Sequence, residues 1–267
     1  MVHVALSHQR SGVAYWPVLR ARRGELEALA HFGPTLGAVV APVLQVAATA
    51  RGPLDSAARF VQELRSRTPA GSDLAVDLAE LDDDGGRSIA RDVAGWLADC
   101  KISMIPVLRL GDSGHRLAEH GAAARTHLDR AVVRFRPDEC APGAADALAA
   151  VHRLCHRSRL APEQCDLLID LGAVRSAAAA REAETAVRRI VGWLRRLPWR
   201  SMVVVAGAMP PSLAGLPTDE PVRLWRWDQA LWARVADLGL AYGDYGVVAP
   251  VPAVTDNGGT TPTIRYT

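Results

Sequence analysis

YWPVLRARRGELEAL, residues 15–29, is the stretch that decides the fold. Four of its first five residues are aromatic or branched, as is typical of a β-strand, and the remaining one, Pro17, lies near the strand start, where a missing N–H is tolerated. Gly24 and Glu25 then begin a run whose apolar positions recur at helical spacing. We therefore predict a strand that passes through a basic turn into a helix, which is half of a βα unit.

The same half-unit recurs along almost the whole chain. Eight strands are expected, at residues 15–19, 37–47, 73–78, 102–110, 130–136, 164–171, 200–206 and 238–248. Seven helices alternate with them, the first starting at residue 24 and the others at 54–67, 88–100, 115–126, 143–158, 177–197 and 224–235. Strands that are apolar on both faces indicate a parallel sheet covered by helices.

Eight such units in about 250 residues favour an α/β fold of the (β/α)8 TIM-barrel type in a single domain. The barrel is expected at residues 15–248, with an N-terminal extension at 1–14 and a polar C-terminal segment at 249–267. A Rossmann-type open sheet is the alternative, but neither G-x-G-x-x-G nor a P-loop follows any of the strands.

Composition limits the function classes. The chain is 49% hydrophobic and 22% charged with a net charge of +2, which is ordinary for a globular protein and gives no general attraction to nucleic acid or membranes. The four cysteines form no C-x-x-C pair, so we expect free thiols in a reducing cytoplasm. The N-terminus lacks the apolar core of a signal peptide, and no apolar run reaches the roughly 18 residues of a membrane span. A soluble, cytoplasmic protein is expected.

In a barrel of this type the active site lies at the C-terminal ends of the strands. The candidates at those ends are polar or charged, and they are Arg20, Arg22, Gln45, Asp77, Arg109, Arg134, Arg136, Asp170, Ser212, Tyr242 and Asp244. Asp77, Arg134 and Asp170 have apolar neighbours on both sides, so each must be paired or must face a polar cavity. Ser212 belongs to a loop after the seventh strand that is long and proline-rich, and a loop of this length suggests a functional role.

These residue types favour the binding of an anion. Arg134 and Arg136 point to the same face of their strand and would clamp a phosphate or carboxylate. Arg20, Arg22 and Arg109 would assist them. Asp77, Asp170 and Asp244 would supply acid–base chemistry or coordinate Mg²⁺. Arg–Asp pairs also serve as structural plugs in barrels, and this alternative stays open for each residue taken singly.

The chain also resembles a known family, the phage-related "beta protein" family, over roughly residues 15–248. The motifs that carry the resemblance are R-x-R-x-G-E (20–25), P-V-L-Q (42–45), V-D-L (76–78), I-P-V (105–107), V-R (133–134), I-D-L-G (169–172), A-G-x-x-P (206–210), R-W-x-x-x-L-W (226–232) and Y-G-D-Y (242–245). Lysines are usual in the family where this chain has Arg20 and Arg22, and Glu is usual where it has Gln45. The loss of that carboxylate weakens a metal-binding or general-base role at the second strand.

The resemblance implies an association with phages, mobile elements or the systems that answer them, and it brings no established reaction. The leading hypothesis is an enzyme that acts on a phosphate-bearing or other anionic substrate, such as a nucleotide, a nucleic-acid end or a phosphosugar. A hydrolase, phosphodiesterase or transferase activity would fit. The alternative is a non-catalytic ligand-sensing or assembly subunit of a phage-defence or mobile-element system, with a protein partner encoded beside it. A purely structural barrel is a third reading.

Overall fold

The computed structural model describes residues 14–31, 39–83, 86–139, 143–213, 215–217 and 220–250. The expected N-terminal extension lies outside these residues apart from Ala14, and so does the expected C-terminal segment beyond Pro250. Within the described part of the chain, no helix is long and apolar enough to cross a membrane.

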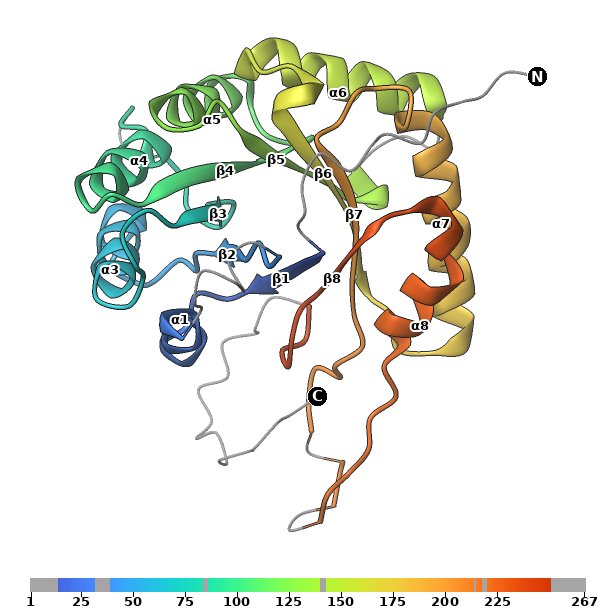
Figure 1. Ribbon diagram of the computed structural model, residues 1–267. Coiled ribbons are helices and arrows are strands. Elements are labelled where there is room, and N and C mark those ends of the chain that lie inside the picture. The colour runs from blue at the N-terminus through green and yellow to red at the C-terminus, as the bar shows by residue number, and fades with distance from the viewer. Residues whose placement is uncertain are drawn as a thin grey trace.

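Eight parallel strands close into a barrel, in which each strand pairs with the next along the chain and the last pairs with the first (Figure 1). They are β1 (Tyr15–Leu19), β2 (Val43–Gln45), β3 (Asp73–Asp77), β4 (Ser103–Arg109), β5 (Ala131–Phe135), β6 (Cys165–Ala173), β7 (Ser201–Gly207) and β8 (Ala241–Asp244). The predicted TIM-type barrel is confirmed.

Helices surround the barrel on its outer side (Figure 1). Among the described residues they are α1 (Arg23–Ala30), α3 (Pro53–Arg65), α4 (Ile89–Asp99), α5 (Gly114–Thr126), α6 (Ala144–Ser158), α7 (Ala177–Leu194) and α8 (Trp227–Arg234), with short 3₁₀ turns η1 (Pro137–Glu139), η2 (Pro162–Gln164) and η3 (Ala236–Leu238). Ser88, Ser113 and Ser176 cap α4, α5 and α7 with their hydroxyls, which satisfies backbone N–H groups that the helix leaves free.

Two strands are shorter than the sequence pattern predicts. The sequence pattern predicts β8 over residues 238–248, but Leu238 ends the η3 turn and the strand covers only four residues. Gly239 and Gly246 adopt positive φ angles of 64° and 56°, which break the extended chain on either side. The pattern predicts β2 over residues 37–47, whereas the strand covers Val43–Gln45 and is preceded by an isolated bridge at Val40.

Successive side chains alternate between the barrel interior and the helix layer, as parallel strands require. The interior is filled by one apolar cluster, Trp16, Val18, Val43, Ala75, Ile105, Val107, Val132, Leu168, Val203, Val205, Ala241 and Tyr245. Two larger clusters pack between strands and helices, one around α5–α8 and one around α1, α3 and α4. The interior positions that follow this cluster towards the strand ends define the mouth of the barrel.

An ion pair closes the opposite end of the interior, where the strands begin. Asp166, near the start of β6, is fully buried, and it accepts hydrogen bonds from Arg130 Nε at 2.8 Å and from Ser201 Oγ at 2.7 Å. This pair is structural, and its residues are not among those predicted for the site.

Candidate functional site

A buried layer of four side chains spans the barrel just below its mouth: Asp77, Arg134, Asp170 and Tyr245. Arg134 lies at its centre with 2% of its surface exposed. Its guanidinium donates to Asp77 Oδ2 at 2.6 Å, to Asp170 Oδ2 at 2.7 and 2.9 Å, and to the Tyr245 hydroxyl at 2.6 Å. The Tyr245 hydroxyl donates in turn to Asp170 at 2.8 Å. The charges that the sequence required to be paired are therefore paired with one another.

The electrostatic interactions within the buried layer keep Asp77 and Arg134 in their ionised forms. Burial alone would raise the pKa of Asp77, but Arg109 and Arg134 outweigh it and lower that pKa to about 2. Burial would likewise lower the pKa of Arg134, yet the charges of Asp170, Tyr245 and Asp77 raise it well above its ordinary value. Asp77 is consequently ionised at neutral pH, which suits a positioning residue better than a general acid or base.

Above this layer, Arg109 reaches towards solvent from the end of β4. Its Nη2 donates to Asp77 Oδ2 at 2.6 Å, and 22% of its side chain is exposed. Gln45 lies opposite Asp77 in the β2–β3 register. Among the described residues, neither Arg109 Nε nor Gln45 Oε1 has a hydrogen-bond partner, although both atoms are buried. An unpaired buried polar group costs about 1–3 kcal/mol. Because neither atom is accessible, the exposed part of the Arg109 side chain is what a bound molecule would contact.

Three further charged residues form the rim of the mouth. Arg20 contacts Glu80 at 3.3 Å, and Arg136 contacts Asp138 at 3.2 Å. Glu139, in the η1 turn directly after β5, has a pKa raised by burial even though Arg109 and Arg136 act to lower it. Sequence reasoning missed Glu139, and the available signal was its place three residues after Arg136, the last residue of the predicted strand.

A polar hollow of about 350 Å³ opens beside Arg109, between the loops that follow β3 and β4. It is lined by Ala79, Asp82, Asp83, Gly111, Asp112, Ser113 and Arg116. Two backbone contacts tie it to the buried layer, since Ala79 N donates to Asp77 Oδ1 at 3.1 Å and Asp112 Oδ2 accepts from Arg109 N at 2.9 Å. Carboxylates arranged around a wet hollow accept hydrogen bonds from hydroxyl groups.

Two predicted site residues lie at the surface. Arg22 is exposed at the start of α1, where its backbone N–H donates to Glu25 Oε2 at 3.0 Å. Ser212 is exposed in the segment that follows β7. The structure brings neither residue into the hydrogen-bond network of Arg134.

Tyr242 and Asp244 lie on the outer face of β8, because Ala241 and Tyr245 occupy its inner face. There Asp244 accepts hydrogen bonds from Tyr15 at 2.7 Å and from Arg226 at 2.6 Å. Tyr242 contacts Arg226 at 2.9 Å and stacks on Tyr15 with ring centroids 5.7 Å apart. This outer cluster ties the residues before α8 to the β8–β1 seam. The structure thus separates Asp244 and Tyr242 from Asp77 and Asp170, contrary to the expectation of one shared mouth.

The three predicted carboxylates do not form a common metal-ligand group. Within the described part of the chain, no three His, Cys, Asp or Glu side chains are grouped so that they could hold a metal ion. Asp77 and Asp170 have arginine partners instead. Cys100, Cys155 and Cys165 are free thiols, and Cys140 lies outside the described residues.

Fold and site together define a (β/α)8 barrel protein with a charged layer at the C-terminal ends of its strands. More particularly, the chain belongs to the Beta protein family, whose pattern it matches over residues 15–267. The resemblance inferred from the motifs is confirmed by this match. A search of the curated proteins finds no match.

Solved structures with a similar fold include three enzymes. Triosephosphate isomerase from Bartonella henselae is 12% identical, covers 88% of this chain and 92% of its own, and superposes with a TM-score of 0.43. The active domain 2 of chitinase from Pyrococcus furiosus is 12% identical over 90% of this chain and 84% of its own, with a TM-score of 0.43. Alanine racemase from Clostridium difficile 630 is 12% identical over 92% of this chain and 54% of its own, with a TM-score of 0.43. At these identities the likeness concerns the fold alone.

Proposed function

We propose that the mouth of the barrel binds a small molecule that carries both a phosphate and hydroxyl groups, and that the protein is an enzyme acting on it. A nucleotide, a phosphosugar or the end of a nucleic acid has this chemistry. The observation that carries the proposal is the state of Arg109: Asp77 fixes one end of its guanidinium at 2.6 Å, while 22% of its side chain stays exposed at the mouth.

The anionic end of the ligand would bind to Arg109. A guanidinium presents donors in a rigid fork that matches phosphate oxygens, and the hydrogen bond to Asp77 holds that fork in place. Arg136, 36% exposed and paired only with the exposed Asp138 among the described carboxylates, would supply a second positive charge. Gln45, half-buried at the end of β2, would lie beside the same ligand.

The hydroxylated end would occupy the polar hollow next to Arg109. Asp82 is exposed there, and Asp112 bridges the backbone of Arg109 to the hollow. This arrangement of one cationic and one acidic subsite favours a phosphorylated polyol over a simple anion. Glu139 is the residue that would move a proton, because its raised pKa is nearer to neutrality than that of Asp77.

Calorimetric titration with ribose 5-phosphate, AMP and ribose tests the binding step. The phosphorylated compounds are expected to bind and ribose to bind far more weakly. Arg109→Gln should weaken binding at least tenfold, which corresponds to about 1.4 kcal/mol. Arg91→Gln on α4 is the matched control, since it removes an arginine paired with Glu119 at 2.6 Å outside the barrel. Equal affinity of the Arg109→Gln variant and the parent protein would refute the anion site.

The catalytic step needs its own readout. Phosphorus-31 NMR of the protein incubated with ribose 5-phosphate or AMP should show a new phosphate resonance, and Glu139→Gln should slow its appearance while binding is retained. If the Glu139→Gln variant converts the substrate at the same rate as the parent protein, Glu139 has no role in the mechanism.

One observation favours a second candidate, a non-catalytic ligand-sensing or assembly subunit. The acidic groups of the buried layer are committed to Arg134, and Asp77 stays ionised down to a pH of about 2. In that case the ligand would bind as described and remain chemically unchanged. A phage or anti-phage setting, a protein partner and a cytoplasmic location stay predictions for either candidate.

A further inference from the structure

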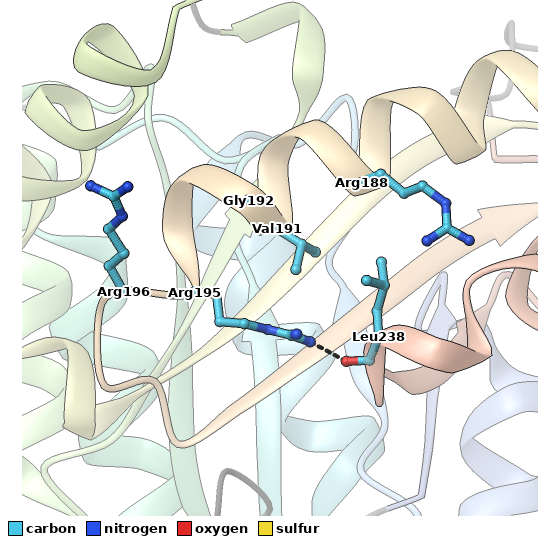
Figure 2. Close-up of a pocket in the computed structure, with 6 residues that line it drawn as sticks. All are labelled: Arg188, Val191, Gly192, Arg195, Arg196 and Leu238. Carbon is cyan, nitrogen blue, oxygen red and sulfur yellow. Dashed lines mark hydrogen bonds between the residues drawn. The ribbon is translucent and has the colours of Figure 1, made fainter. Parts of the chain in front are cut away.

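We propose that a second site, on the outside of the barrel between α7 and η3, binds a small amphipathic anion. Its ligand would have a carboxylate or phosphate headgroup and a short apolar body. The site is a hollow of about 310 Å³ lined by Arg188, Val191, Gly192, Arg195, Arg196 and Leu238 (Figure 2). This volume is near the lower end of the range for small-molecule pockets.

The hollow is independent of the mouth. Its residues belong to the last two turns of α7 and the residues just after it, and to the turn that leads into β8. Both segments lie next to the beginnings of strands, since α7 leads into β7 and η3 into β8. The mouth lies at the opposite end of the barrel, so ligands at the two sites would not compete for space.

The floor of the hollow is apolar and is kept open by a glycine. Val191 is 2% exposed, and Leu238 packs against the core cluster around α5–α8. Gly192 lies inside α7, where glycine costs roughly 0.5–1 kcal/mol relative to alanine. A Cβ at this position would meet nothing within 4 Å, so packing does not require the glycine. The missing side chain leaves room that an apolar ligand group would fill.

The walls carry positive charge that is only partly balanced, since Asp237, whose pKa is lowered first by Arg188, also feels the charge of Arg195. Arg195 reaches across to donate to the backbone oxygen of Leu238, and Arg196 lies at the edge of the hollow (Figure 2). Neither forms an ion pair with any carboxylate in the part of the chain that the structure describes. Arg188 differs, because Asp237 and Glu184 bind it at 2.8 and 3.1 Å. Arg188 therefore shapes the wall, whereas Arg195 and Arg196 are the groups that would bind the anion.

An apolar floor beneath two such arginines fits a molecule with one charged end. The headgroup would take the remaining N–H groups of Arg195 and those of Arg196, and the body would lie over Val191 and Gly192. A fully polar anion would leave the floor wet, and an uncharged apolar molecule would leave both guanidinium groups without a new partner.

Fluorescence titration of the full chain with 8-anilinonaphthalene-1-sulfonate tests the proposal, because this probe joins an aromatic body to a sulfonate. Saturable binding is expected, with displacement by hexanoate or hexyl phosphate and not by 1-hexanol. The more effective competitor identifies the headgroup. Displacement by 1-hexanol as effective as that by hexanoate would overturn the role of charge.

Paired variants assign the binding to this hollow. Gly192→Leu fills the floor and Arg195→Gln removes a donor, and each should weaken probe binding at least tenfold. Gly95→Leu is the control for the first, since Gly95 is also an exposed helical glycine with nothing within 4 Å of an added Cβ. Arg189→Gln is the control for the second, since Arg189 lies on the same helix and stacks on Trp193. If folded Gly192→Leu, checked by circular dichroism, binds the probe as the parent does, the site is excluded.

Discussion

Asp77 is the residue on which the geometry of the mouth depends most directly. One of its carboxylate oxygens accepts hydrogen bonds from both Arg109 and Arg134, and the other accepts the backbone N–H of Ala79. Without this charge, Arg134 would keep only Asp170 as a carboxylate partner and Arg109 would lose its anchor.

Asp77→Asn is therefore expected to lower the free energy of unfolding by about 3–5 kcal/mol, the usual cost of removing one partner of a buried ion pair. Asp138→Asn is the control, since Asp138 pairs with Arg136 at 3.2 Å but is 68% exposed, and such surface pairs contribute about 0–1 kcal/mol. Urea denaturation followed by circular dichroism measures both. Equal midpoints for the two variants would contradict a structural role for Asp77.

The same carboxyl predicts a dependence of stability on acid. Its pKa is about 2 in the folded protein against an ordinary 3.8, so the unfolded chain binds the proton more strongly. The stabilisation is complete above pH 3.8 and is lost as the pH falls from there towards 2. Urea midpoints measured from pH 5 down to pH 2.5 should decrease for the parent, and that decrease should be smaller for Asp77→Asn. Parallel curves would argue against the assigned pKa.

A second group acts in the same direction at higher pH. His120 is buried in α5 with its Nδ1 2.8 Å from the Arg116 carbonyl, and burial lowers its pKa below the ordinary 6.5. Because the unfolded chain takes up this proton first, stability should begin to fall as the pH drops below 6.5. His120→Gln should flatten the profile of urea midpoints between pH 7 and pH 5, and an unchanged slope would contradict the prediction.

At the residue scale, the sequence identified the charges that must be buried but not all of their partners. Asp77, Arg134 and Asp170 stand out because charge inside an apolar strand has to be compensated. Tyr245 completes their layer, and the Y-G-D-Y motif does not by itself show which of its side chains face the barrel interior. The period-2 alternation of a strand places Tyr245 inside with Ala241 and sends Tyr242 and Asp244 outward, once the inner face of β8 is known.

At the element scale, the contact between α5 and α6 depends on one glycine. A Cβ at Gly121 would lie 1.9 Å from the backbone oxygen of Ser158, which cannot move without displacing α6. Gly121→Ala is expected to destabilise the protein by about 1–3 kcal/mol, as overpacking usually does. Gly95→Ala in α4 should instead stabilise it by about 0.4–1 kcal/mol, because the space there is open. Thermal melts of the two variants should shift in opposite directions.

Element boundaries were less predictable than element types. Apolar runs correctly indicated eight strands, since parallel strands are buried on both faces and leave a strong pattern. The same pattern overextended β8, because Leu238 and Val248 are apolar for reasons of loop packing and turn formation. Where an extended chain stops depended on the backbone angles of Gly239 and Gly246, which hydrophobicity does not encode.

At the scale of the whole molecule, the two sides of the barrel are built unequally. β6 and β7 have nine and seven residues, whereas β2 has three and β1 five. Longer ladders and the larger cluster around α5–α8 give β5–β7 more interactions to lose on opening. Native-state hydrogen exchange followed by mass spectrometry should show slower exchange in β5–β7 than in β1 and β2. Uniform protection around the barrel would contradict this prediction.

The buried layer bears on how this barrel would respond to selection. Buried ion pairs can often be exchanged for well-packed apolar residues without loss of stability. A library randomised at positions 77, 134, 170 and 245 and selected only for folding should drift towards leucine, methionine and valine, whereas selection in the native host should restore the four original side chains. The difference between the two selections would then show which of the four side chains are maintained for function and which for folding.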